Sequence, residues 1–112
     1  MYTFLEQLDQ EGRKNFLADH NLRFIMDYNQ DIIRMACAYV KFRIHKQRIN
    51  FDSNVADRAG ILDWICNKSY EAMDELRPRI RRRDMNKLLL GTRTIEDTYR
   101  KHYIDKKEEL WT

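Results

Sequence analysis

Residues that form tight turns are scarce in this chain, which has 3 glycines and 1 proline among its 112 residues. A protein built of many short strands needs such residues at regular intervals, because they supply the backbone conformations of turns. A chain with so few of them favours a small number of long helices. The sequence therefore predicts an all-α fold, a compact bundle of four to five helices that forms one domain over residues 1–112.

The longest helical pattern is predicted to run from about residue 21 to about residue 47. At 100° per residue its apolar side chains cover more than half of the circumference. The residues on the apolar side are Leu22, Ile25, Met26, Ile32, Ile33, Ala36, Tyr39, Val40 and Ile44. A helix so widely apolar must be covered by several others, so we expect it at the centre of the bundle. A second copy of the chain could cover part of it, which leaves a homodimer open.

Capping patterns predict two short helices before this central one. Thr3 and Glu6 have the spacing of a capping box, in which each side chain satisfies a free amide at a helix start. Gly12 is expected to end that first helix, because glycine commonly stops helices. A second short helical piece is expected to reach Asp19.

Further helices are predicted after the central one, beginning with a helix over about residues 55–76. The polar residues that offer its N-cap are Asp52, Ser53 and Asn54. Pro78 is tolerated in the first turn of a helix but not in its interior, so a new helix is expected to start there and to end before Gly91. Thr94 has capping-box spacing with Asp97 and is expected to begin the last helix.

Charge is segregated along the chain, although the formal net charge is only +3. Residues 77–93 carry seven basic and one acidic side chain, whereas residues 51–76 carry two basic and six acidic ones. A second basic segment, KFRIHKQR, lies at the end of the central helix. Cations in that position complement the negative end of the helix dipole, so we interpret this second segment as structural.

The densest basic segment, RPRIRRRDMNKLLLG, contains the chain's one proline, Pro78. On a helix, one side would carry Arg79, Arg82, Arg83, Asn86 and Lys87, while Met85, Leu88 and Leu89 would dock on the bundle. The candidate binding residues are Arg77, Arg79, Arg82, Arg83, Asn86 and Lys87. Arginine presents planar bidentate donors that suit phosphates, and asparagine can read an adenine edge. We therefore expect a small regulatory protein that engages nucleic acid through a basic helix at about residues 78–90.

An acidic protein surface would suit the same basic face equally well. Trp64 lies on the polar side of the 55–76 helix, and large aromatic side chains are favoured as interface anchors. The alternative function is therefore an inhibitor or adaptor that uses the basic face and Trp64. Two structural interpretations also stay open: a solvated basic face balanced by nearby acids, and another helix packed over Trp64.

No sequence motif for catalysis, phosphate-loop binding or metal ligation is recognisable. The histidines His20, His45 and His102 are far apart, and His45 falls on the polar stripe of the central helix, where we expect solvent exposure. We therefore expect no enzyme, cofactor or metal. Cys37 and Cys66 are interpreted as free thiols in a reducing cytoplasm. The chain lacks a long apolar run and a secretory signal pattern, so we expect no membrane association.

Overall fold

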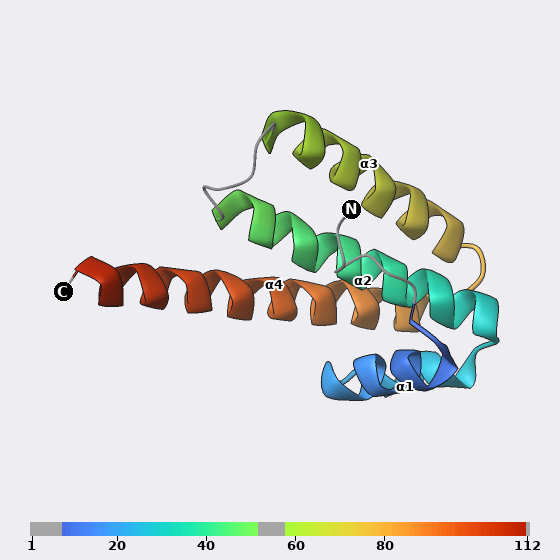
Figure 1. Ribbon diagram of the computed structural model, residues 1–112. Helices are drawn as coiled ribbons and strands as arrows, with labels where there is room; N and C mark the ends of the chain where they lie inside the picture. Colours follow the sequence, from blue (N-terminus) through green and yellow to red (C-terminus); the bar gives the residue numbers. More distant parts are fainter. Residues whose placement is uncertain (1–7, 52–57, 112) are drawn as a thin grey trace.

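The computed structural model describes residues 8–51 and 58–111, with the side chains of residues 8–50 and 60–102 among them. The elements in chain order are α1 (Gln10–Asp19), the 3-10 helix η2 (Arg23–Asp27), α2 (Gln30–Phe51), α3 (Arg58–Leu76) and α4 (Arg82–Trp111). No strand occurs among these described residues. The predicted all-α bundle is thus confirmed, with four α-helices in this part of the chain (Figure 1).

The helix α1 begins at an N-cap that the sequence patterns did not single out. The Asp9 carboxylate accepts a hydrogen bond of 2.7 Å from the Gly12 amide, which satisfies one of the free donors of the first turn. Gly12 therefore lies inside the helix start, and the prediction that it ends a helix is wrong. The predicted capping box of Thr3 and Glu6 lies outside the described residues.

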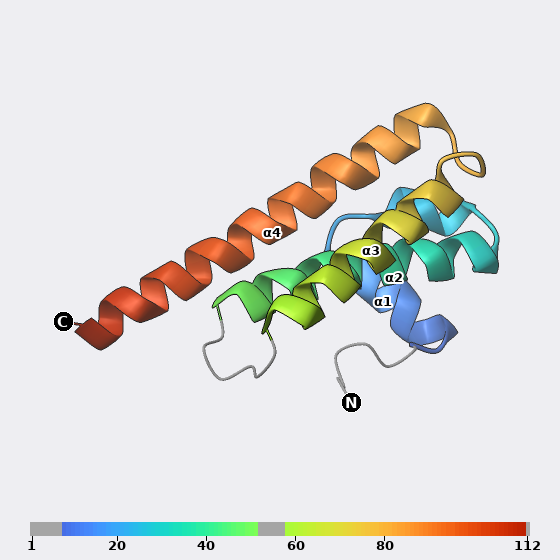
Figure 2. The same ribbon diagram turned by 90° about the horizontal axis from the view of Figure 1, so that it is seen from above.

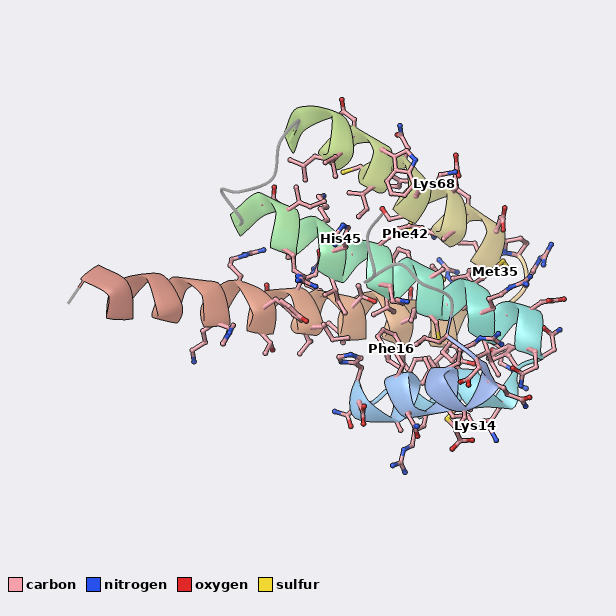
Figure 3. The ribbon with its side chains drawn as sticks, in the orientation of Figure 1. Lys14, Phe16, Met35, Phe42, His45 and Lys68 are labelled. Carbon is pink, nitrogen blue, oxygen red and sulfur yellow. The ribbon has the colours of Figure 1, made fainter. Side chains whose placement is uncertain are left out.

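A Schellman motif ends α1 and turns the chain toward η2. Asn21 adopts a left-handed backbone with φ of 60°, which asparagine tolerates better than most residues. The Leu22 amide donates to the Leu17 carbonyl at 2.8 Å, and the Asn21 amide donates to the Ala18 carbonyl at 3.2 Å. Leu17 and Leu22 are both buried, so the turn also contributes to the core. Figure 3 shows Phe16 on the side of α1 that faces the bundle.

The predicted central helix over 21–47 is wrong in its extent, because the chain forms η2 and α2 with a break at Tyr28 and Asn29. The Asn29 side chain accepts a hydrogen bond of 3.0 Å from the Ile32 amide and so caps α2. Asparagine competes with the helix backbone in this way, which makes it a better cap than interior residue. The backbone of Tyr28 is extended, and its hydroxyl donates a hydrogen bond to Asp84 in the first turn of α4.

The helix α2 lies in the middle of the bundle and contacts α1, η2, α3 and α4. Figures 1 and 2 show α3 and α4 on different sides of α2, joined by a turn at one end. The buried residues of α2 include Ile32, Ile33, Ala36, Cys37, Tyr39, Val40 and Ile44. Burying a large apolar side chain stabilises a fold by roughly 1.5–3 kcal/mol. The predicted apolar side is confirmed, with Met26 alone only half-buried.

The helix α3 ends at Leu76, as predicted, and the N-cap candidates Asp52, Ser53 and Asn54 lie outside the described residues. The helix boundaries predicted for the rest of the chain are wrong, whereas the predicted docking of Met85 and Leu88 on the bundle is confirmed by their burial. Pro78 lies in the turn between α3 and α4, and no helix begins there. The helix α4 then runs without interruption for 30 residues through both Gly91 and Thr94.

Close packing explains why Gly91 sits inside α4 instead of ending it. A Cβ atom at this position would lie 2.9 Å from Cδ2 of Leu22, so glycine allows the turn after α1 to approach α4. Thr94 donates its hydroxyl to the Leu90 carbonyl at 3.1 Å, an interaction typical of a helix interior and not of an N-cap. Tertiary packing therefore overrides the local stop and start signals.

His45 is buried, with 6% of its surface exposed, so the prediction that it faces solvent is wrong. The neighbouring helices cover the stripe of α2 that carries it, because this helix is surrounded on more sides than its apolar pattern indicates. Burial lowers the pKa of His45, and the nearby Arg48 lowers it further.

Within the described part of the chain, no helix combines the length and the apolar character that a membrane span requires.

Candidate nucleic-acid interface

The inward face of α4 begins with a capping arrangement that includes a tyrosine. The Arg81 amide donates to the Tyr28 hydroxyl at 3.0 Å, and this hydroxyl donates to Oδ2 of Asp84 at 2.5 Å. Asp84 is buried and lies in the first turn of α4, where a carboxylate complements the helix dipole. The single acidic residue of the basic segment is therefore engaged by η2–α2 and does not balance the exposed arginines.

Glu96 is the second buried carboxylate of α4, with 4% of its surface exposed. Its two oxygens accept from Arg43 Nη2 at 2.6 Å and from Arg43 Nε at 3.1 Å, which is a bidentate pair. Gln47 Nε2 donates to the same carboxylate at 3.0 Å, and Arg43 Nη1 donates to the Tyr39 hydroxyl at 2.9 Å. This network joins α2 to α4 and fixes which face of α4 turns inward.

The network also explains why Arg43 stays protonated and why this residue of the second basic segment lies between α2 and α4. Burial by itself lowers the pKa of Arg43, but the hydrogen bonds that Arg43 donates to Glu96 raise it above its ordinary value. The guanidinium stays charged and forms an ion pair with Glu96 between the two helices. The interpretation of the second basic segment as structural holds for Arg43, although the reason is an ion pair with Glu96 and not the helix dipole.

The charged residues on the outward face of α4 are almost all cations over residues 82–102. Its exposed basic residues are Arg82, Arg83, Lys87, Arg93, Arg100 and Lys101. Asp97 is the one exposed acid of this stretch, and it lies 3.8 Å from Nη1 of Arg100. Asn86 is exposed on the same face. We call this set of residues the basic face of α4.

The structure thus brings together four of the predicted binding residues and adds three that the sequence reasoning missed. Arg82, Arg83, Asn86 and Lys87 lie on the first two turns of the basic face. The added residues are Arg93, Arg100 and Lys101. The sequence contains a pattern that places Arg93 and Arg100 on this face, because positions 86, 93 and 100 repeat at seven-residue spacing along one side of a helix. The prediction missed this pattern because it ended the helix at Gly91.

Arg77 and Arg79 are exposed but belong to the turn before α4, so the predicted place of Arg79 on the helix face is wrong. The Arg79 amide donates to the Leu76 carbonyl at 2.9 Å, and Arg77 Nη2 lies 3.5 Å from the sulfur of Met73. Buried Ile80 anchors this turn in the core. The two arginines extend the positive charge around the end of the bundle and are not in line with the basic face.

Trp64 is 44% exposed and packs edge to face on Phe42 of α2, with ring centroids 6.0 Å apart. The indole is therefore half covered by the protein's own bundle. Trp64 lies on α3 and the basic face lies on α4, and these two helices are on different sides of α2 (Figure 1). The tryptophan and the basic face therefore do not form one continuous patch.

Four of the exposed acids that could balance the basic face lie on α3. The exposed acidic residues of α3 are Asp63, Glu71, Asp74 and Glu75. Lys68 pairs with Glu71 at 3.4 Å on the same helix. Since α3 and α4 lie on different sides of α2, the charge segregation of the sequence persists in the fold (Figure 2).

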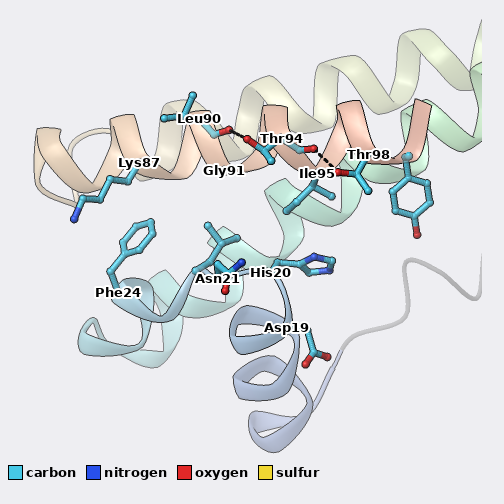
Figure 4. Close-up of a pocket in the computed structure, with 12 residues that line it drawn as sticks. Asp19, His20, Asn21, Phe24, Lys87, Leu90, Gly91, Thr94, Ile95 and Thr98 are labelled. Carbon is cyan, nitrogen blue, oxygen red and sulfur yellow. Dashed lines mark hydrogen bonds between the residues drawn. The ribbon is translucent and has the colours of Figure 1, made fainter. Parts of the chain in front are cut away.

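A groove runs beside the basic face, between α4 and the segment of residues 19–24 (Figure 4). Its volume is about 620 Å³. Lys87 stands at its edge, and its ammonium lies 5.7 Å from the centre of the Phe24 ring. His20 also lines the groove and packs edge to face on Phe16 at 4.8 Å.

No protein-family model, curated protein or solved structure matches this chain. Among the described residues, no three His, Cys, Asp or Glu side chains gather in a way that could hold a metal ion. The function of this protein is therefore inferred from the charge and shape of its own surface.

Proposed function

We propose that this protein is a small, non-enzymatic regulatory protein that binds nucleic acid through the basic face of α4. The observation that carries the proposal is the exposure of six cations and one acid on one side of residues 82–102. Asp84 and Glu96, the other acids of this stretch, are buried and hydrogen-bonded to residues outside α4. An unbalanced cationic helix of this kind suits a regular array of phosphates.

The continuity of α4 supports the same proposal. From Arg82 to Lys101 the helix rises by about 29 Å, so its cations form one long row instead of a local cluster. Four of the six cations are arginines, which bind phosphate oxygens in a bidentate manner. Asn86 lies within the row, where it suits contact with a base edge. Each phosphate neutralised releases counterions and makes the affinity fall with salt.

The test compares two variants that each remove two positive charges. Arg82→Gln/Arg83→Gln alters the basic face, whereas Lys14→Gln/Arg34→Gln alters exposed cations on α1 and α2. Affinity for DNA and RNA is measured by fluorescence anisotropy over a salt series. The first variant is expected to weaken binding several-fold and to lower the salt slope for duplex DNA by about 0.9 for each phosphate that the variant no longer neutralises. The second is expected to bind as the wild type does.

Equal behaviour of the two variants would contradict the proposal, because binding would then depend on net charge and not on the basic face. The same holds if the wild-type protein binds neither DNA nor RNA at low salt.

An acidic protein is the second candidate partner, and one observation favours it. Leu90 is 67% exposed in the middle of the basic face, and an apolar residue surrounded by cations is typical of protein interfaces. Such an inhibitor or adaptor would use Leu90 with the basic face, and Trp64 only through a second contact. Tighter binding to polyglutamate than to single-stranded DNA of equal charge, abolished in Leu90→Ala, would favour this function.

The cytoplasm is the compartment that we propose for either function. Cys37 and Cys66 are free thiols, and burial raises the pKa of Cys37 to about 11. A buried, protonated thiol is stable in a reducing compartment. We also propose that the protein forms a homodimer. Light scattering tests this, and a measured mass of twice the monomer mass would support it.

A further inference from the structure

The groove beside the basic face combines aromatic walls with a cationic edge. Its aromatic lining residues are His20, Phe24 and Tyr99, contributed by three different parts of the bundle. Figure 4 shows the Phe24 ring directed toward α4 from the segment below it, with the His20 ring extending sideways beneath the same helix. The volume of about 620 Å³ lies within the range of about 300–1,000 Å³ that is usual for small-ligand pockets.

The α4 side of the groove follows one row of the helix. The positions in this row are Lys87, Gly91, Thr94, Thr98 and Lys101, at spacings of four, seven, eleven and fourteen residues from the first. Gly91, Thr94 and Thr98 line the groove with small side chains, and an exposed lysine stands at each end of the row. Both threonine hydroxyls donate to carbonyls of α4 itself, which leaves their oxygens as acceptors toward the groove.

The charges around the groove favour an anionic occupant that carries a flat ring. Lys87 lies at the edge over the Phe24 ring, and Arg83 stands one turn earlier on α4. Asp19, the acidic lining residue, directs its side chain away from α4 (Figure 4). Burial lowers the pKa of His20 against the opposing effect of Asp19, so the neutral ring is an aromatic surface near pH 7.

We infer, on the basis of the proposed function, that this groove receives an unpaired base of single-stranded nucleic acid. The base stacks on the Phe24 ring, while Lys87 binds a phosphate next to it and Lys101, about 21 Å further along α4, binds a phosphate several nucleotides away. Stacking on aromatic side chains beside a cationic row is the general mode of single-strand binding. Bases in a duplex are stacked on one another and present only their edges, so they cannot stack on the Phe24 ring.

The experiment compares oligothymidylate with a duplex of the same length, for the wild type and two matched variants. Phe24→Leu removes the ring at the groove, and Phe42→Leu removes an equally half-buried ring that packs on Trp64. Phe24→Leu is expected to weaken single-strand binding by about fivefold or more, with duplex binding changed less than twofold. Phe42→Leu is expected to leave both affinities unchanged.

A second pair of measurements separates stacking from charge. Phe24→Leu is expected to leave the salt slope of single-strand binding unchanged, whereas Lys87→Ala lowers it by about 0.7. Thr94→Leu/Thr98→Leu fills the groove with larger side chains that favour helix. This double variant is expected to lose single-strand binding while keeping duplex binding, as Phe24→Leu does. If circular dichroism shows that Phe24→Leu is unfolded, the double variant replaces it in the experiment.

Three outcomes would overturn the inference. If these groove variants bind oligothymidylate as the wild type does, or weaken single strand and duplex equally, the groove does not receive a base, and the proposed function still stands. If the wild type binds neither form at low salt, the proposed function fails and the groove inference fails with it.

Discussion

The two faces of α4 differ in the sign and the burial of their charged residues. On the inward face, Asp84 and Glu96 are buried and accept hydrogen bonds from Tyr28, Arg43 and Gln47. On the outward face, six cations are exposed and only Asp97 is an exposed acid among residues 82–102. The comparison shows that the charge of a helix in sequence is not the charge of its surface, because the fold can remove one sign from solvent.

The size of this effect follows from a simple count over residues 82–102. This stretch carries six basic and three acidic residues, a net charge of +3, but two of the three acids are buried. The surface that a partner meets is therefore charged +5. Direct contacts with a phosphate are made by the side chains that face solvent, so the basic face offers a partner six cations and one acid.

The largest expected effect comes from breaking the inward face at Glu96. Glu96→Ala leaves the buried guanidinium of Arg43 without its carboxylate and should lower the free energy of unfolding by about 3 kcal/mol. This value is at the lower end for buried pairs because 31% of the Arg43 side chain is exposed. The measurement is urea denaturation followed by circular dichroism.

The control is the neighbouring acid on the outward face. Asp97→Ala removes a surface pair and should change the free energy of unfolding by less than about 0.5 kcal/mol. Similar losses of stability in the two variants would refute the distinction between the faces.

Gly91 tests how closely the turn after α1 approaches α4. Gly91→Val brings side-chain atoms against buried Leu22 and should destabilise the protein by about 2 kcal/mol, as overpacking commonly does. Leu90→Val, one residue earlier and exposed, controls for the helix propensity of valine and should cost less than about 0.7 kcal/mol. Thermal unfolding distinguishes the two, and a stabilised Gly91→Val would contradict the close packing.

A smaller effect is expected at the tyrosine that caps α4. Tyr28→Phe removes the hydroxyl that joins the Arg81 amide to buried Asp84, and should cost about 1–2 kcal/mol in chemical denaturation. Tyr70→Phe is the matched control, because Tyr70 is exposed on α3 and its change should be close to zero. Equal stabilities of the two variants would mean that the bridge contributes nothing.

The smallest effect concerns pH and again arises from buried groups. Burial lowers the pKa of His20 and of His45 in the folded protein below their ordinary value of 6.5. The unfolded chain then binds more protons, so the stability that is present above pH 6.5 is lost as the pH falls through the folded pKa values. We expect the free energy of unfolding to decrease from pH 7.5 to pH 5.5. The decrease should be smaller in His20→Gln/His45→Gln, and an unchanged slope in this variant would contradict the assignment.

Predictions from the sequence were accurate where a pattern reports on burial over many residues. The apolar side of residues 32–44 is buried in α2, and the Leu76 end of α3 is where the periodicity stops. They were inaccurate where a single residue was used as a boundary. Gly12, Pro78 and Gly91 each resemble a helix boundary in sequence, but a cap, a turn and a close contact decide their actual roles.

The candidate site was predicted in part for the same reason. Arg82, Arg83, Asn86 and Lys87 were found because they crowd together in sequence. Arg93, Arg100 and Lys101 were missed because only an uninterrupted α4 aligns them with the others. Phe24 and His20 could not have been placed beside Lys87, since the turn at Asn21 brings them there from a distant part of the chain.

The sequence by itself determined the helical class, the apolar side of α2 and the accumulation of positive charge after residue 76, because composition and periodicity act locally. Only the tertiary structure decided that α4 is one helix, that Asp84 and Glu96 are turned inward, and that a groove lies beside the remaining cations. These outcomes depend on contacts between residues more than 50 positions apart, such as Arg43 with Glu96 and Tyr28 with Asp84. Long-range packing and hydrogen bonds of this kind outweigh local propensities of about 1 kcal/mol or less.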